Sequence, residues 1–135
     1  MDLTKTYPRS PKETLAGLVH IPRMIDKARA CSQDSLGQYI FPCPLDKMVL
    51  EFLNIEVEEF LEQASSEIRM RLWLLGRCSG KSSEQKQSLN QRILNKKPDT
   101  IEKKKKFTEL IDRVNPARKD IITWVDLIDL EEGRL

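Results

Sequence analysis

The only histidine, His20, opens a string whose side chains could bind a ligand or carry out acid–base chemistry. On a helix, residues three and four positions apart are neighbours, so His20, Arg23 and Lys27 share one side, with Asp26 offset by one residue. A cationic cluster near a helix start suits a carboxylate or phosphate. The alternative is structural: His20 hydrogen-bonds a neighbouring loop and Arg23 pairs with an acid near the C-terminus. We favour the structural interpretation.

Acidic residues gather in and before a second string, Trp124 to Arg134. They could in principle bind a divalent cation, but their spacing matches no EF-hand loop. We therefore predict no metal site, and expect a solvated face or acidic partners for Arg9, Arg23 or Arg29. In this interpretation, the last helix packs against the first helix. We also count Asp126 among the ligand-binding candidates. The acids are Asp120, Asp126, Asp129, Glu131 and Glu132.

The three cysteines, Cys31, Cys43 and Cys78, are widely spaced and form no C-x-x-C motif, which excludes a zinc ribbon or a thioredoxin-type site. We expect free, partly buried thiols in a reducing compartment. Cys43 lies between two prolines and could be a nucleophile only beside His20. We favour inert packing. The catalytic residues are therefore unknown.

The segment Gly76 to Ser82 ends in Gly-Lys-Ser but has three residues between its glycines, where the phosphate-binding P-loop has four. No strand is predicted before it, so we reject a P-loop and predict no cofactor.

Charge is nearly balanced over the chain, with 23 basic and 21 acidic residues, but it is segregated. Residues 81–106 hold nine basic and three acidic residues, and residues 45–68 hold one basic and seven acidic residues. No aromatic residue lies between Lys81 and Lys106, so stacking on bases is not expected there. Four consecutive lysines also circle a helix rather than lining one side. Opposed patches favour contact between two copies.

The apolar spacing is helical nearly everywhere. A capping box at Ser10 predicts a first helix, and helices are also expected over 22–31, 45–52, 57–64 and 68–75, the last ended by Gly76. Three more begin after Ser82, at Asp99 to Glu102 and at Thr123, and residues 32–44 are irregular. No sheet is predicted. The expected fold is all-α, a single compact domain of six to eight short helices in an irregular bundle over residues 1–135, with 1–9 as an extended arm.

The longest apolar run, Leu72 to Leu75, is far shorter than the roughly 20 residues that cross a bilayer. The N-terminal residues 1–12 are polar and charged, without the apolar core of a signal peptide. We expect a soluble cytoplasmic protein that does not bind membranes.

Both end strings resemble those of a family of small bacterial proteins of unknown function. The first resemblance covers Arg9-Ser10-Pro11 and the string His20-Ile21-Pro22-Arg23, Ile25-Asp26-Lys27, and the second covers Trp124 to Arg134. Ser82, Glu84 and Asn90 fit the middle of the family, whereas Leu89 and Lys86 depart from it. The resemblance implies a small helical fold of bacterial origin and no assigned activity.

These observations predict a non-enzymatic helical protein that binds itself, as a homodimer, or another protein. Two alternatives remain open. One is an anionic small-molecule site on His20, Arg23, Asp26, Lys27 and Asp126. The other is weak nucleic-acid binding through Lys96 to Lys106, which we do not expect.

Overall fold

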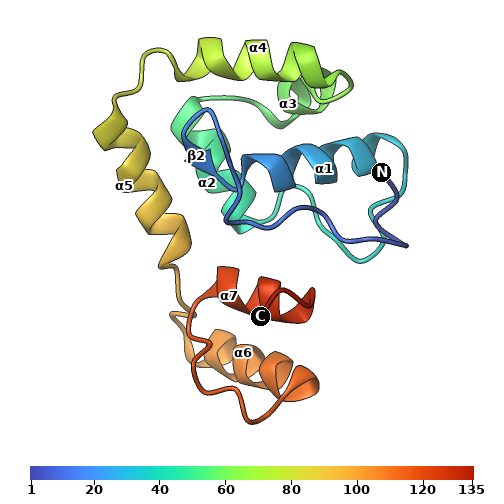
Figure 1. Cartoon of the computed structure of the whole chain (residues 1–135), viewed down its shortest axis with the longest axis vertical. Coiled ribbons are helices and arrows are strands. Elements are labelled where there is room, and N and C mark those ends of the chain that lie inside the picture. The colour runs from blue at the N-terminus through green and yellow to red at the C-terminus, as the bar shows by residue number, and fades with distance from the viewer. The chain divides into compact units, whose positions relative to one another are not determined.

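The computed structural model describes residues 1–135 and contains seven helices and one two-stranded hairpin (Figure 1). The prediction of a largely all-α fold with six to eight helices is confirmed. The chain divides into two compact units, residues 1–90 and residues 91–135, which are described separately. The number of folding domains stays a prediction. No helix is both long and apolar enough to cross a membrane.

The segment after Ser10 forms a turn and a short hairpin instead of the predicted helix. The Ser10 and Glu13 contacts of a capping box are present, since the Ser10 N–H donates to Glu13 Oε2 over 3.2 Å. The chain then reverses, because Ala16 and Gly17 take positive φ values of 55° and 81°. Two such residues make the tight turn that suits a hairpin. Strands β1 (Thr14–Leu15) and β2 (Leu18–Val19) pair antiparallel, so the prediction of no sheet was also wrong.

Asn90 fastens this hairpin to helix α5 (Ser83–Leu94) within the first unit. Its Oδ1 accepts the Val19 N–H over 3.0 Å, and its Nδ2 donates to the Gly17 carbonyl over 3.0 Å. We expect Asn90→Ala to lower the free energy of unfolding by about 1–3 kcal/mol, because the Val19 N–H loses its acceptor in a buried place. Urea denaturation checks this. Asn95→Ala is the matched control, since Asn95 makes only an exposed bond to Gln91; an equal effect of both substitutions would contradict the prediction.

The core of the first unit collects apolar side chains from β2 and from helices α1 (Ile21–Ser32), α2 (Pro44–Leu53) and α3 (Val57–Gln63). Phe60 is central to it, with the rings of Phe41 and Trp73 at centroid distances of 5.7 and 6.2 Å. Proline at the first turns of α1 and α2 suits a helix start. The fully buried members include Leu18, Ile21, Met24, Val49 and Phe60.

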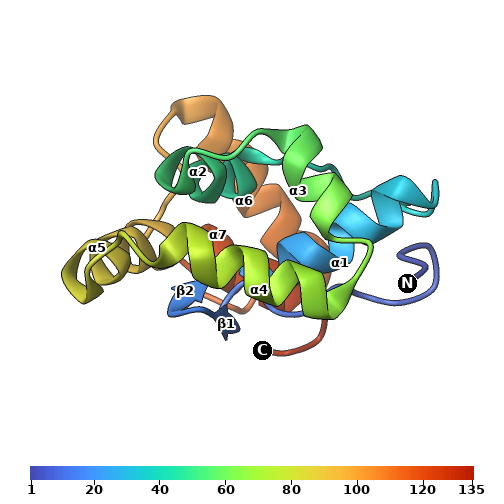
Figure 2. The same cartoon turned by 90° about the horizontal axis from the view of Figure 1, so that it is seen from above.

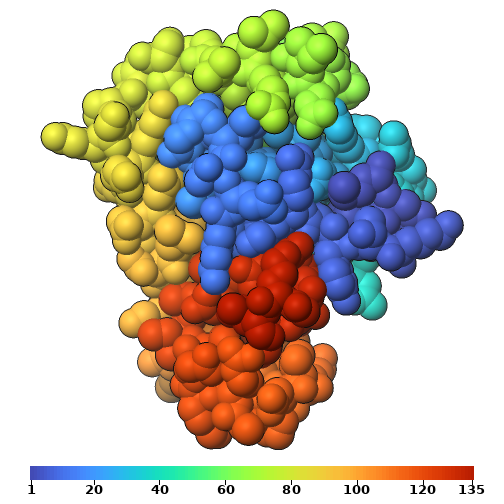
Figure 3. Space-filling view, viewed as in Figure 1, coloured from blue at the N-terminus to red at the C-terminus, as the bar shows by residue number.

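Helix α4 (Glu67–Cys78) has two sets of apolar side chains and buries only one of them. Its buried residues are Met70, Leu74 and Cys78, whereas Ile68, Leu72 and Leu75 are 74%, 66% and 57% exposed. Both sets have helical spacing, so the periodicity could not decide between them. The helix also continues past Gly76. In Figure 1, α4 lies along the upper edge of the first unit, and in Figure 2, seen from above, it crosses in front of the other elements of that unit; Figure 3 shows its side chains (yellow-green) at the surface.

The second unit is built on helices α6 (Ile101–Val114) and α7 (Trp124–Glu131). Thr100 and Thr123 cap them as predicted, each accepting a backbone N–H from the first turn. The rings of Phe107 and Trp124 meet edge to face at 5.0 Å. Val114, the last residue of α6, is 47% exposed. The cluster contains Phe107, Ile111, Ile121, Leu127 and Leu130.

Candidate functional site

His20 takes a strained place where the hairpin meets α1. It is the N-cap of α1 with a φ of 76°, a left-handed conformation that residues other than glycine seldom adopt. Its ring is fully buried. Strain of this kind persists only where the surroundings hold it, and it is common at functional sites. The partner that holds His20 comes from α2.

Asp46 in the first turn of α2 is that partner. One carboxylate oxygen, Oδ1, lies 2.6 Å from His20 Nε2, and the other, Oδ2, accepts from Lys27 Nζ over 2.7 Å. Oδ2 also accepts the Cys43 N–H over 2.8 Å, which completes a capping box at the start of α2. Asp46 and His20 are fully buried and Lys27 is nearly so. We call His20, Lys27, Cys43 and Asp46 the buried polar cluster.

The surroundings of Asp46 and His20 shift their pKa values and so determine which of the two carries a proton at pH 7. Burial would raise the pKa of the Asp46 carboxyl, but the His20 hydrogen bond and the Lys27 charge outweigh burial and lower that pKa far below its usual range. Burial lowers the pKa of His20, despite the opposing effect of Asp46. His20 is therefore neutral at pH 7, and its Nε2–H donates to Asp46. The lone pair then sits on Nδ1, which is buried and has no hydrogen-bond partner.

Cys43 completes the cluster as the N-cap of α2. Its Sγ lies 3.3 Å from Lys27 Nζ, and the side chain is half-buried. Burial raises the pKa of the Cys43 thiol, and the Asp46 charge adds to this effect. The thiol is therefore protonated at pH 7 and is a poor nucleophile in this state. All three cysteines are free, as predicted.

Arg23 and Asp26 lie on a neighbouring part of α1 and contact the segment before the hairpin. Asp26 accepts three hydrogen bonds from Arg9, one from its backbone N–H and two from its guanidinium, at 2.9–3.0 Å. Arg23 Nη1 donates to the Arg9 carbonyl over 3.2 Å, and its guanidinium lies 5.4 Å from the Tyr39 ring centroid. Asp26 is thus an acidic partner of Arg9.

The C-terminal string has internal partners of its own. Arg134 Nη1 pairs with Asp129 over 3.1 Å and also with Glu132. Asp126, the remaining ligand-binding candidate, lies in the first turn of α7, and its backbone N–H donates to Thr123 Oγ1. Of the predicted residues, the structure brings His20 and Lys27 together on one carboxylate, and Asp26 and Arg23 together on Arg9.

Sequence reasoning missed Asp46 entirely and left the position of Cys43 open. A signal was present in Cys43-Pro44-Leu45-Asp46, which has a proline at the first helical position and an acid two residues later. That pattern predicts a capped helix start. It does not reveal that the capping carboxylate also receives His20 and Lys27, which lie 26 and 19 residues away.

The donor atoms of His20, Cys43 and Asp46 lie within 4.8 Å of one another, a spacing that a metal ion could bridge. Lys27 already neutralises the carboxylate, however, and a metal would have to displace this ammonium and the thiol proton. The hydrogen-bonded pairing therefore describes the cluster better than a metal centre does.

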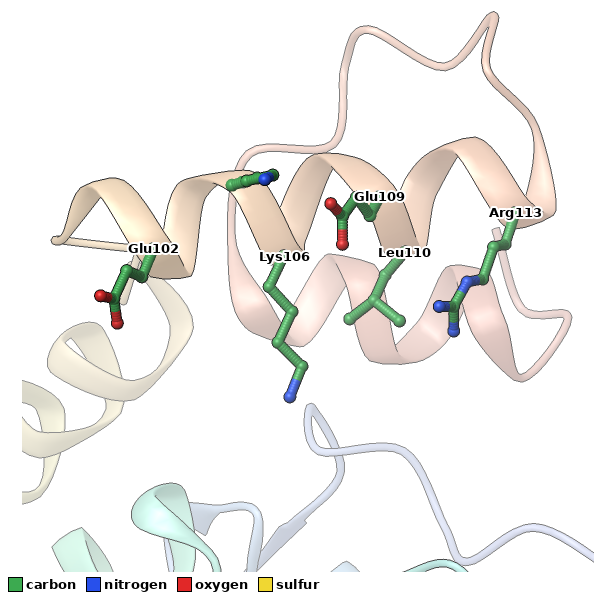
Figure 4. A pocket seen from close by; sticks show the side chains of 6 residues that line it. Glu102, Lys106, Glu109, Leu110 and Arg113 are labelled. Atoms are coloured by element: carbon green, nitrogen blue, oxygen red, sulfur yellow. The ribbon is translucent and has the colours of Figure 1, made fainter.

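The surface of α6 carries a hollow of about 370 Å³ (Figure 4). Lys106, Leu110 and Arg113 extend to the same side of the helix in this view. Glu102 and Glu109 line the same hollow, so its charge is mixed. Residues of one helix cannot enclose a small molecule, and interleaved acids weaken attraction to a phosphate backbone. This hollow does not support the nucleic-acid alternative.

No curated protein matches the chain. One family model does, over residues 5–134, and its description is a domain of unknown function, DUF5069. Because the match includes the hairpin, the buried polar cluster and both end strings, the chain belongs to the DUF5069 family.

Proposed function

We propose that this protein is a non-enzymatic interaction domain that pairs with a second copy of itself through α4. The observation that carries the proposal is the exposed apolar stripe of Ile68, Leu72 and Leu75. Such side chains favour removal from water by about 25 cal/mol per Å² of apolar surface. Singly exposed apolar residues need no explanation, but a continuous helical stripe marks a binding surface.

The stripe is self-complementary, which favours a second copy over an unrelated partner. Ile68 and Leu75 lie at nearly equal distances along the helix from Leu72. Two α4 helices in antiparallel orientation would therefore place Ile68 on the partner's Leu75, as a twofold interface requires. The space beside Gly76 is open, since a Cβ there would meet nothing within 4 Å, so the two backbones can approach closely.

Charge does not decide the orientation, because Arg77 in the last turn of α4 already pairs with Glu59 of the same chain over 2.8 Å. Three apolar side chains from each copy cover much less than the roughly 1,600 Å² of a standard interface, so we expect weak, concentration-dependent association.

Sedimentation velocity over a range of protein concentrations tests this proposal. The wild type is expected to sediment faster as the concentration rises, and Leu72→Glu is expected to weaken association by roughly tenfold or more, because it buries a charge in both halves of the interface. The matched control is Ile101→Glu, at an apolar residue of α6 that is 87% exposed. A wild type that stays monomeric, or a control that weakens association equally, would overturn the proposal.

The second candidate function is a small-molecule site on His20, Arg23, Asp26 and Lys27 of the first unit, and the unpartnered His20 Nδ1 favours it. A neutral imidazole offers a lone pair there, so the ligand would be a hydrogen-bond donor rather than the anion first expected. Thermal-shift measurements with amines, alcohols and anions separate the two ligand classes. If an anion raises the melting temperature and Arg23→Ala abolishes this effect, the ligand is an anion, as the sequence first predicted.

A further inference from the structure

One contact in the buried polar cluster has no role in the His20–Asp46 hydrogen bond or in self-association through α4. It is the contact between Lys27 and Cys43. Lys27 Nζ lies 3.3 Å from Cys43 Sγ, and the two residues belong to different elements, the middle of α1 and the N-cap of α2. Lys27 is nearly buried, so its amino group has few alternative positions. Cys43 is half-buried as a residue, unlike the fully buried His20 and Asp46 beside it.

We propose that Lys27 and Cys43 form an oxidative covalent crosslink, in which one oxygen atom bridges Nζ and Sγ. Three observations support it together: the Nζ–Sγ distance, the partial exposure of Cys43, and the position of Asp46. Asp46 Oδ2 contacts Lys27 Nζ at 2.7 Å and holds the amino group beside the sulfur. Cys78 interacts with Lys86 and Lys81 through their charges, without the hydrogen bond that joins Lys27 to Cys43.

The chemistry balances with a peroxide as oxidant. The first equivalent oxidises Cys43, through its minor thiolate form, to a sulfenic acid and leaves as water. Lys27 loses one proton to hydroxide from the solvent and becomes a neutral amine. The second equivalent of peroxide then removes one hydrogen from the amine and one from the sulfenic O–H, forming the N–O bond and two water molecules. Four equivalents of an added thiol reverse the process, giving the amine, the Cys43 thiol, water and two disulfides.

The crosslink would tie α1 to the start of α2 across residues 32–42, the irregular segment between them. A thiol surrounded by apolar groups and far from any amine would instead continue to sulfinic and sulfonic acids. Capture by Lys27 stops this irreversible oxidation, so the contact makes Cys43 a reversible modification site.

The experiment uses the full chain with Cys31→Ser and Cys78→Ser, so that Cys43 is the only thiol. Hydrogen peroxide is added, and the intact mass is measured before and after dithiothreitol. We expect most chains to gain one oxygen and lose two hydrogens, and dithiothreitol to restore the starting mass. After trypsin, peptide 24–29 is expected to be joined to peptide 30–47, with Lys27 left uncut.

Two variants serve as controls, the first in the same background and the second in a chain that carries only Cys78→Ser besides its own substitution. Lys27→Met removes the amine, and we expect only oxygen gain without hydrogen loss. A chain with Cys43→Ser that keeps Cys31, the other half-buried thiol, tests whether any accessible cysteine reacts. The peptide map of the Lys27-containing chain stands even where a variant folds poorly.

Oxidised Cys43 with Lys27 still cut by trypsin would overturn the proposal, as would a thiol that peroxide leaves unchanged. Loss of two hydrogens with no oxygen gained would show a direct S–N bond and overturn the bridging oxygen. The outcome is independent of the self-association proposal, since the cluster and the α4 stripe share no residue.

Discussion

Asp46→Asn is expected to lower the free energy of unfolding by about 3–5 kcal/mol, the usual cost of breaking a buried ion pair from one side. The substitution keeps the size of the side chain but removes the charge that faces Lys27 Nζ at 2.7 Å. The ammonium is then left in a nearly dry place without a counter-ion. The amide also has only one acceptor oxygen, which cannot serve His20, Lys27 and the Cys43 N–H together. Urea denaturation followed by circular dichroism measures the loss.

A double-mutant cycle shows whether the uncompensated charge is the cause. In a Lys27→Met background the buried ammonium is gone, so Asp46→Asn should cost much less than in the wild type. Asp99→Asn is the matched control for an exposed acid, because Asp99 pairs with Lys103 at the surface, and it should leave the urea midpoint unchanged. A wild-type loss below about 1 kcal/mol, or equal losses in both backgrounds, would show that Asp46 does not hold the cluster together.

The elements of this fold were predictable where local signals and packing agree. Pro22 and the apolar residues after it predicted α1, and Thr100 and Thr123 marked the starts of α6 and α7. At Ser10 the local signal was misleading, since a serine–glutamate pair three residues apart also closes a turn. Ala16 and Gly17 then reverse the chain, and only the pairing of Thr14 with Val19 shows why.

The candidate site was predicted in part for a similar reason. Spacing on one helix placed His20 and Lys27 on a common side, and they do share a partner. The partner, Asp46, comes from another helix, and contacts between distant segments leave no periodic trace in the sequence. Of the arginines expected to pair with a C-terminal acid, namely Arg9, Arg23 or Arg29, Arg9 forms an ion pair with Asp26 on α1 over 3.0 Å, and pairing with a C-terminal acid stays a prediction.

The exposed stripe on α4 shows that the sequence pattern also cannot decide which apolar residues are buried. Residues 68–78 contain two sets of apolar side chains at helical spacing, and each could form the buried face. Burial of Met70, Leu74 and Cys78 decides the matter through packing with the rest of the first unit. The set left outside, Ile68, Leu72 and Leu75, then becomes the strongest feature of the surface.

Acid is expected to destabilise the protein from about pH 6.5 downward, earlier than carboxyl groups alone would allow. Burial lowers the pKa of His20 in the folded chain, whereas in the unfolded chain the pKa is near 6.5. Below that pH the unfolded chain binds a proton that the folded chain does not, so stability falls by up to about 1.4 kcal/mol per pH unit. Below about pH 4 the lowered pKa of Asp46 adds a loss of the same sign. Above pH 7 neither group contributes a slope.

Urea midpoints between pH 8 and pH 4.5 measure this dependence, and His20→Gln isolates it. Glutamine can still donate to Asp46 but does not titrate, so the variant should be less stable at pH 7 yet lose the slope between pH 6.5 and 4.5. Equal slopes in both proteins would contradict the prediction. The ring signals of His20 in the proton NMR spectrum of the folded wild type give an independent check. They should not shift between pH 8 and pH 5.5, because a fully buried imidazole bonded to Asp46 through Nε2 can accept a proton only at Nδ1, where no group stabilises the charge.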